Sequence, residues 1–198
     1  ILTLAATGSE MNAGSVVTNF ETKEKNGWGS PYTNPKFSIL DPENTYSVSY
    51  HQTGCGIVDS LTHVYEFYFS SENAYLNDRV CEGIMKTIIH YGPKALENPQ
   101  DYEARSNLMF GSTLALNGVS GFAKDFEGFN HTTEHVLSAF YDIAHADGLA
   151  VLAPHWMEYI LSEKTVDKFY EFAVNVWGVH PGDDKMDIAK KGINKVFE

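Results

Sequence analysis

The spacing of apolar residues changes near residue 51, and this change limits the folds that the chain can adopt. Before it, runs rich in β-branched and aromatic residues predict strands over 1–6, 15–21 and 37–40, with a turn-prone stretch over 26–31. After it, apolar residues recur three and four positions apart, the spacing of helices with a buried face. These short strands are too few to form a sheet with both faces buried. We therefore expect them to complete a larger sheet.

The second part of the chain is predicted to be helical almost throughout. Turn signals at Gly92-Pro93, Pro99, Gly118 and Gly178 separate its segments. Helices are predicted near residues 51–68, 76–88, 101–118, 131–142, 146–160, 166–176 and 184–198. The chain opens on a strand-like run without a Met and stops inside a helical pattern, which indicates a piece of a longer protein. The predicted fold class is mainly α, with an all-helical domain over 51–198, incomplete at its C-terminal end, preceded by a few strands over 1–50 that belong to an incomplete α/β domain.

Composition excludes several classes of protein. The formal net charge is −12, which disfavours a nucleic-acid partner because phosphate binding needs a basic face. The sequence has no apolar run long enough to cross a membrane and no signal peptide, so we expect no membrane association. Cys55 and Cys81 are too few for a disulfide scaffold, and a reducing cytoplasm is the expected location. A hydrophobic content of 43% is enough for a globular core.

The first candidate chemical site is the segment Asp59-Ser-Leu-Thr-His63. A carboxylate and an imidazole four residues apart lie on the same face of a helix, so both can reach one metal ion. Apolar residues on the opposite face predict a helix that is buried all round. A buried Asp and His must either pair with each other in the core or bind a cation, and the spacing alone leaves both readings open.

The second candidate site is a group of histidines, His131, His135 and His145, within a segment of fifteen residues. The first two are one helical turn apart, and the third lies where one predicted helix gives way to the next. Together with Asp59 and His63, they predict a mixed nitrogen and oxygen site suited to Fe²⁺, Zn²⁺ or a similar ion.

The same residues match a competing motif. His131-x-x-Glu134-His135 has the H-x-x-E-H pattern of a class of zinc metallopeptidases, in which Glu134 would be the general base. This hypothesis leaves Asp59, His63 and His145 without a role. A non-catalytic helical metal-binding module is a third hypothesis.

Longer segments give the chain a family resemblance. They are Ala6-Thr-Gly-Ser-Glu10, Gly54-Cys-Gly-Ile-Val-Asp59-Ser-Leu-Thr-His63, Tyr102-Glu-Ala-Arg105, Ala115-Leu-Asn-Gly118 and the run from His131-Thr-Thr-Glu-His135 through His145 to Ala150. Across essentially its full length the chain resembles the iron-containing alcohol dehydrogenases, most closely their butanol dehydrogenase branch. The resemblance implies that residues 1–50 are the end of a dinucleotide-binding α/β domain and that residues 51–198 are a metal-binding catalytic domain.

The resemblance also implies roles for individual residues. Asp59, His63, His131 and His145 are then the ligands of a divalent metal, with Fe²⁺ favoured and Zn²⁺ as the alternative. His135 is then a catalytic residue beside the metal, near the nicotinamide, with a proton-relay or orienting role. The cofactor-binding residues implied by the family are Thr3, Thr7, Ser9 and Lys25.

The activity implied is hydride transfer between NADH or NADPH and an aliphatic alcohol or aldehyde such as butanol or butanal. The family's Gly-rich phosphate-binding loop does not occur in this sequence. The expected activity of residues 1–198 alone is therefore weak or absent, and the choice between the two nucleotides is left open. By the same resemblance the expected assembly is a homodimer. We also hypothesise that Phe122 and Phe126 line an apolar substrate entrance.

Overall fold

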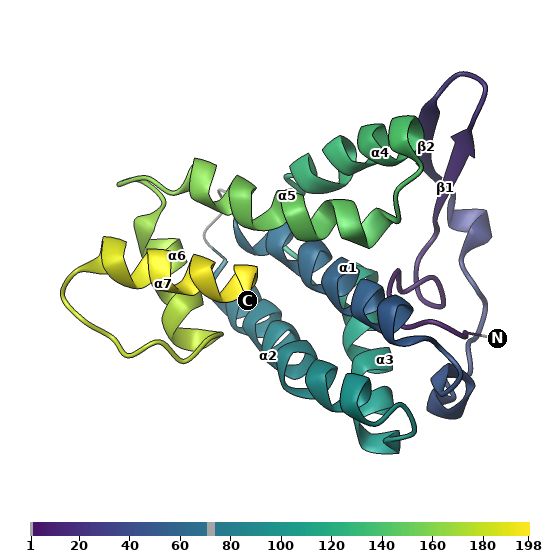
Figure 1. Ribbon diagram of the computed structural model, residues 1–198, viewed down its shortest axis with the longest axis horizontal. Helices are drawn as coiled ribbons and strands as arrows, with labels where there is room; N and C mark the ends of the chain where they lie inside the picture. The colour runs from purple at the N-terminus through teal and green to yellow at the C-terminus, as the bar shows by residue number, and fades with distance from the viewer. Residues whose placement is uncertain (1, 71–73) are drawn as a thin grey trace. The chain divides into compact units, whose positions relative to one another are not determined.

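The computed structural model describes residues 2–70 and 74–198 (Figure 1). Helices dominate these residues, which confirms the predicted fold class. The strands are β1 (Gly14–Asn19) and β2 (Glu24–Gly29), and the short 3-10 helices are η1 (Pro31–Thr33) and η2 (Pro42–Thr45). The α-helices are α1 (Tyr50–Tyr68), α2 (Tyr75–Glu97), α3 (Tyr102–Leu116), α4 (Phe129–Tyr141), α5 (His145–Ile160), α6 (Val166–Asn175) and α7 (Lys185–Phe197).

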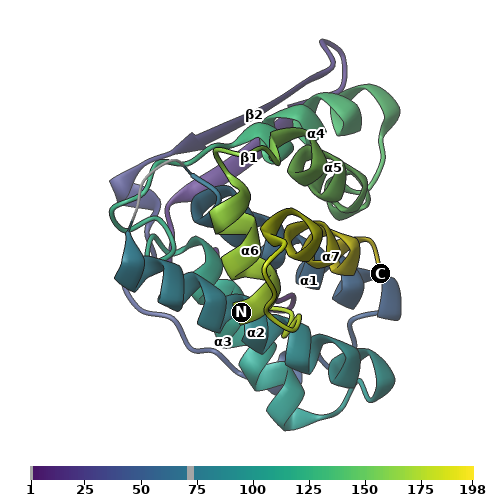
Figure 2. The ribbon, with the colours of Figure 1, turned by 90° about the vertical axis from the view of Figure 1, so that its left-hand side faces the viewer.

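The chain forms two compact units, residues 1–149 and 150–198, and α5 begins in the first and ends in the second. In the first unit α1 packs against α2 and α3, and α4 contacts both α1 and β2. Figures 1 and 2 both show α4 beside the β1–β2 hairpin. In the second unit α6 packs on α7, where Gly192 lies against the backbone and side chain of Ala173.

The hairpin differs from its prediction in one strand. β1 falls where a strand was expected, but its antiparallel partner β2 occupies most of the stretch predicted as a turn, 26–31. The turn instead lies between the strands, where Lys23 has a φ of 57°. Pairing along the whole of β1 satisfies the backbone groups of β2 that face it, and this outweighs the local turn preference of Asn26 and its neighbouring glycines.

Two further predicted strands are wrong. Residues 2–6 contain no strand and bend from residue 4 onward, and residue 1 lies outside the described residues. Residues 37–40 are irregular, with Phe37 83% and Ile39 79% exposed. Neither segment has a neighbouring strand to pair with in the described part of the chain, and an unpaired strand leaves its backbone groups unsatisfied.

One predicted helix boundary is also wrong. The Gly92-Pro93 pair does not end a helix but lies inside α2, where Gly92 packs on Ile57 of α1.

The segment from Leu4 to Glu10 is fixed to the helices by close backbone contact. An added Cβ on Gly56 of α1 would lie 2.2 Å from the carbonyl oxygen of Ala5, so only glycine allows this approach. The Ser60 hydroxyl donates to the Ala6 carbonyl at 3.2 Å, and the buried Glu10 carboxylate accepts from Thr113 of α3. These contacts set the position of the residues in between.

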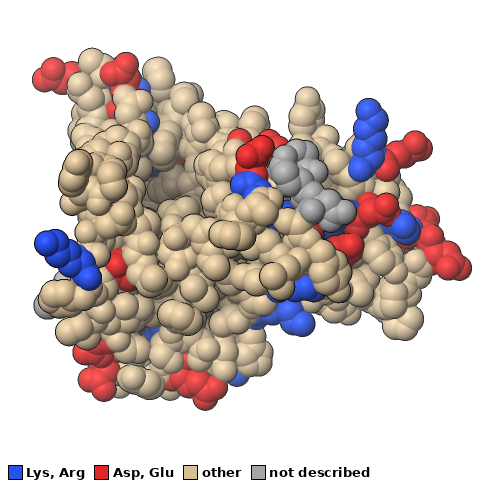
Figure 3. All heavy atoms as spheres, turned by 180° about the vertical axis from the view of Figure 1, so that it is seen from behind, with Lys and Arg blue, Asp and Glu red and all other residues tan. Residues whose placement is uncertain are grey.

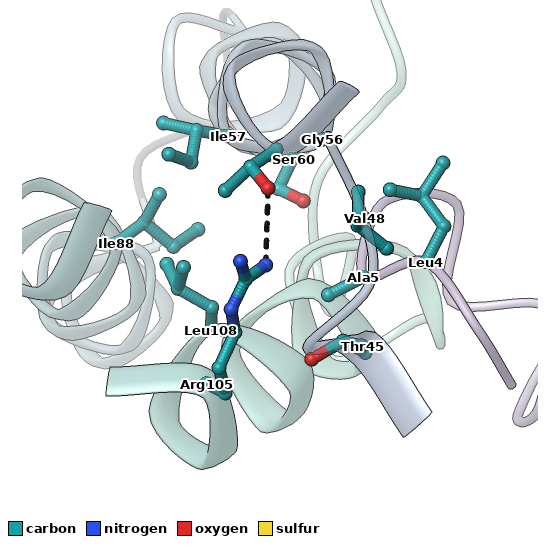
Figure 4. A pocket seen from close by; sticks show the side chains of 11 residues that line it. Leu4, Ala5, Thr45, Val48, Gly56, Ile57, Ser60, Ile88, Arg105 and Leu108 are labelled. Atoms are coloured by element: carbon teal, nitrogen blue, oxygen red, sulfur yellow. Dashed lines mark hydrogen bonds between the residues drawn. The ribbon is translucent and has the colours of Figure 1, made fainter. Parts of the chain in front are cut away.

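Figure 4 shows the small pocket behind this segment. Leu4 and Ala5 face it from one side, and Ile57, Ile88 and Leu108 face it from α1, α2 and α3. The buried Arg105 extends from α3 towards α1, where its Nη1 donates to Thr53 Oγ1 at 3.0 Å. The guanidinium thereby links α3 to the first turns of α1.

The surface carries charges of both signs. On the face drawn in Figure 3, acidic and basic side chains are interspersed, and much of the area is neither. Among the described helices, none combines the length and apolar character that crossing a lipid bilayer requires.

Candidate metal centre

One face of α1 carries three ionisable side chains. Asp59, His63 and Glu66 follow one another at intervals of four and three residues, so they lie on the same face of the helix, and all three are buried. From Gly56 to Tyr68 every residue of α1 is buried or half-buried, which confirms the predicted all-round burial. This face points to a position that histidines from α4 and α5 also reach.

Three imidazoles converge on one carboxylate oxygen. The Nε2 atoms of His63, His131 and His145 lie 3.7, 3.5 and 3.7 Å from Asp59 Oδ1. A tetrahedral ion with bonds of about 2.1 Å holds neighbouring ligand atoms about 3.4 Å apart, so these separations suit ligands of a common ion. The structure therefore brings together the four residues that the sequence singled out, from α1, α4 and the start of α5.

The hydrogen bonding of these atoms also fits a cation. Among the described residues, Asp59 Oδ1 and His131 Nε2 are buried without a hydrogen-bond partner. An isolated buried carboxylate costs several kcal/mol, so such an oxygen calls for a positive charge beside it. The donor atoms of Asp59, His63 and His131 all lie within 4.8 Å of one another, whereas His145 falls in a neighbouring group with Glu134 and His135 and reaches Asp59 Oδ1 through its Nε2 at 3.7 Å. One carboxylate with three imidazoles is a donor set that suits Fe²⁺ or Zn²⁺.

Glu66 supports this site and was missed in the sequence. Its Oε1 accepts the backbone N–H groups of Asn130 and His131, at 2.7 and 3.2 Å, and its Oε2 pairs with His131 Nδ1. Gly128, the N-cap residue of α4, has no side chain to cap the helix, so Glu66 supplies the cap. The same carboxylate caps α4 and orients the imidazole. Its position seven residues after Asp59 places it on the same face of the helix, and this spacing could have identified it from the sequence.

His145 is oriented by a second buried carboxylate. Glu134 Oε2 pairs with His145 Nδ1 and accepts from Lys25 Nζ at 3.2 Å, while Oε1 accepts from the Ser138 hydroxyl at 2.6 Å. Lys25 Nζ also donates to Ser138 at 2.8 Å and lies 3.3 Å from His145 Nδ1. Lys25 comes from β2, so the hairpin is joined to the site. This carboxylate–histidine arrangement is typical of metal ligands.

The charges in the site shift its pKa values in different directions. Burial is the largest influence on each group. Burial alone would raise the pKa of Asp59, but His63 and His131 outweigh it and lower that pKa. Burial lowers the pKa of His63 to about 4. Burial also acts to lower the pKa of His131, yet the nearby carboxylates of Asp59 and Glu66 raise it to about 9.

His135 lies beside the metal centre rather than in it. Its ring centroid is 5.4 Å from that of His145 and its donor atom lies near those of Glu134 and His145, but unlike His145 it forms no ion pair with Asp59 among the described residues. Burial, followed by the charge of Lys25, lowers the pKa of His135 to about 4. A surface pocket between β2 and α4 is lined in part by Lys25, Thr132, His135, Val136 and Phe140.

The competing peptidase motif is not assembled as its chemistry requires. That mechanism needs His131 and His135 on one ion, but among the described residues His131 forms an ion pair with Asp59 at 3.5 Å and His135 forms none. Glu134, its general base, is fully buried and bonded to Lys25 and Ser138.

The residues implied to bind a nucleotide occupy two places. Thr7 and Ser9 have exposed side chains on the Leu4–Glu10 segment that is fixed to α1 and α3, and the exposed Thr3 directly precedes it. The Lys25 side chain is only 13% exposed and reaches the His145 network.

Comparison with known proteins identifies the family. Residues 53–198 match the model of the Fe-containing alcohol dehydrogenase family, C-terminal, and residues 1–42 match that of iron-containing alcohol dehydrogenase. The chain belongs to the iron-containing alcohol dehydrogenase family. The resemblance inferred from the sequence is therefore confirmed.

Relatives in this family cover the chain almost completely. NADH-dependent butanol dehydrogenase B of Clostridium acetobutylicum is 52% identical over 98% of this chain and 50% of its own length. NADPH-dependent aldehyde reductase YqhD of Escherichia coli is 37% identical over 100% of this chain and 52% of its own. The crystal structure of NADH-dependent butanol dehydrogenase A from Thermotoga maritima matches with a TM-score of 0.93 and 39% identity, over 99% of this chain and 49% of that one. The chain thus spans about half the length of these iron-containing alcohol dehydrogenases.

Proposed function

We propose that this chain supplies the metal centre of an alcohol dehydrogenase or aldehyde reductase that transfers hydride between NADH or NADPH and an aliphatic alcohol or aldehyde such as butanol or butanal. The observation that carries the proposal is the convergence of three histidine Nε2 atoms within 3.7 Å of Asp59 Oδ1. Names of relatives support the reaction class, since they include NADH-dependent butanol dehydrogenases and an NADPH-dependent aldehyde reductase.

In this proposal Asp59, His63, His131 and His145 hold the ion. A divalent ion in that position supplies Lewis acidity towards the oxygen of the alcohol or aldehyde. Glu66 and Glu134 fix the tautomers of His131 and His145, so that each presents Nε2 to the site.

His135 is proposed as the catalytic residue beside the metal. Its pKa of about 4 keeps the imidazole neutral at pH 7, so a ring nitrogen can accept a hydrogen bond from a neighbouring hydroxyl, which supports the orienting role. Phe126 is proposed to line the substrate entrance, because its ring lies 6.2 Å from that of His131. For the exposed Phe122 no comparable contact supports this role in the described residues.

The nicotinamide cofactor is proposed to contact Thr3, Thr7, Ser9 and Lys25. The exposed hydroxyls and the pocket that Lys25 shares with His135 support this role. We expect residues 1–198 alone to turn over weakly or not at all, because the family's phosphate-binding loop is not in their sequence. A cytoplasmic homodimer remains the expected form of the enzyme.

The proposal is tested on the intact protein. The metal-free enzyme is loaded with Fe²⁺ or Zn²⁺, and oxidation of NADH and NADPH is followed with butanal. The wild type should turn over only when loaded, and Asp59→Asn should lose both metal and turnover. A peptidase centred on His131 and His135 would instead keep its metal in Asp59→Asn. A loaded wild type that reduces no aldehyde with either nucleotide would overturn the proposal.

A further inference from the structure

A second group of metal-binding side chains lies at the first turns of α1 and α5. It consists of His51 and Cys55, one helical turn apart on α1, and Asp147 from the first turn of α5. Their donor atoms all lie within 4.8 Å of one another. His51 Nε2 is 3.0 Å from Asp147 Oδ1, and Cys55 Sγ is 3.8 Å from His51 Nε2. None of the three was assigned a role in the metal centre described above.

The group is accessible to ions from solvent. The side chains of His51 and Asp147 are 60% and 53% exposed, and Cys55 is half-buried against its helix. An ion can therefore enter without opening the core, and water can complete its coordination. By contrast, the other cysteine, Cys81, is buried in α2 and its thiol donates to the Ser120 carbonyl at 3.5 Å.

The three donors together select a class of ion. One thiolate, one imidazole and one carboxylate are all ligands that Zn²⁺ uses, and three protein ligands with an open fourth position are a common zinc arrangement. With zinc bonds of about 2.0–2.3 Å, neighbouring donors lie about 3.3–3.6 Å apart. The His51–Asp147 and Cys55–His51 separations, 3.0 and 3.8 Å, lie within a few tenths of an ångström of that range. Mg²⁺ and Ca²⁺ prefer oxygen ligands and are disfavoured by the thiol.

We propose that His51, Cys55 and Asp147 form a second, surface site for Zn²⁺ or a similar borderline-soft divalent cation. The site joins the start of α1, which carries Asp59 and His63 further along, to the start of α5, which begins at His145. An ion bound here restrains the first turn of α5 and with it the position of His145. It is a structural clamp beside the catalytic ion rather than a part of the reaction.

The test uses Co²⁺ as a spectroscopic substitute for zinc in the intact protein, stripped of metal and kept reduced with a phosphine. The wild type should bind two equivalents, one of which gives a near-ultraviolet charge-transfer band from thiolate to Co²⁺. Cys55→Ser should bind one equivalent and lose the band. Asp59→Asn should lose the other equivalent and keep the band, which separates this site from the proposed catalytic one.

Two further variants serve as controls for the source of the band and for misfolding. Cys81→Ser removes the other thiol and should leave the band unchanged. His51→Gln alters a mostly exposed side chain, so it should fold normally and still weaken the band. Zn²⁺ should displace Co²⁺ from the site and slow amide hydrogen exchange in the first turn of α5. A wild type without the band, or a band that survives in Cys55→Ser, would overturn the proposal.

Discussion

Buried carboxylates orient two of the proposed ligands, and each has a further bond that fixes it. Glu66 pairs with His131 while it accepts two backbone N–H groups at the start of α4. Glu134 pairs with His145 while it accepts from Lys25. Because both carboxylates are held by other groups, neither imidazole can rotate without breaking a buried hydrogen bond. The orientations of His131 and His145 are therefore fixed before an ion binds.

Replacing Glu66 tests that organisation. A Gln at this position keeps an oxygen for the α4 amides but cannot accept well from both these amides and His131 Nδ1. We expect Glu66→Gln to weaken metal binding by about 10–100-fold. Glu66→Ala should also lose the cap and destabilise the protein by about 1 kcal/mol more. Competition with a metal indicator and urea unfolding measure the two effects.

The matched control is Glu82→Gln, which changes another buried carboxylate, bonded to Tyr68 and Arg79 in a different place. It should alter stability but leave metal affinity unchanged. Equal losses of affinity in the Glu66 and Glu82 variants would show that Glu66 has no specific part in holding His131.

Cys55 offers a pH-dependent test of its surroundings. Burial, followed by the negative charge of Asp147, raises the pKa of the Cys55 thiol. A raised pKa leaves less thiolate at pH 7, so alkylation of Cys55 should be slow there and should accelerate at higher pH than for a free thiol. Asp147→Asn removes a negative charge and should shift the rate profile to lower pH. An unchanged profile would contradict the assigned electrostatics.

Among the helices, α1 connects most parts of the first unit. It contacts α2, α3 and α4, carries Asp59 and His63, and receives the Leu4–Ala6 segment at Gly56. The glycine pair of Gly54-Cys-Gly56 therefore has two different roles. Nothing lies within 4 Å of an added Cβ on Gly54, whereas one on Gly56 would collide with the Ala5 backbone.

This contrast gives a matched pair of variants. Gly54→Ala should stabilise the protein by up to about 1 kcal/mol, because alanine is the better helix former. Gly56→Ala should destabilise it by about 1–3 kcal/mol, because the Leu4–Glu10 segment must move away. It should also weaken nucleotide binding, since Thr7 and Ser9 lie on that segment. Chemical denaturation and nucleotide titration measure these effects, and the same sign of stability change in both variants would contradict the packing described.

At the scale of the molecule, every proposed metal ligand falls within the first compact unit, residues 1–149. The ligands come from α1, α4 and the start of α5, so an ion that binds them holds together elements far apart in the sequence. Such an ion binds the folded protein, in which the ligands are assembled, and not the unfolded chain. Its binding free energy therefore adds to the free energy of unfolding.

Metal removal should therefore lower the melting temperature. A free ion concentration of one hundred times the dissociation constant corresponds to about 2.7 kcal/mol of stabilisation. We expect a chelator to lower the melting temperature of the intact wild type but to have little effect on a variant that lacks both Asp59 and Cys55. Scanning calorimetry with and without chelator measures this. A wild type that melts at the same temperature in both conditions would contradict it.

The sequence by itself determined the helical body and the candidate ligands. All seven described α-helices match predicted segments because repeated apolar spacing over several turns is a local property that packing reinforces. Spacing along the chain pointed to Asp59 with His63 and to the cluster of His131, His135 and His145, and the resemblance to the family implied which four of these are ligands.

Only the tertiary structure decided the rest. β2 forms in a turn-prone stretch because β1 pairs with it, and residues 2–6 bend because they pack on α1 instead of another strand. Glu66 became part of the site through its contact with the start of α4, sixty-four residues away from Asn130. All of these features depend on which segments of the chain lie together in the folded protein: the pairing of strands, the capping of a helix by a distant residue and the convergence of ligands. Local sequence preferences do not determine which segments lie together.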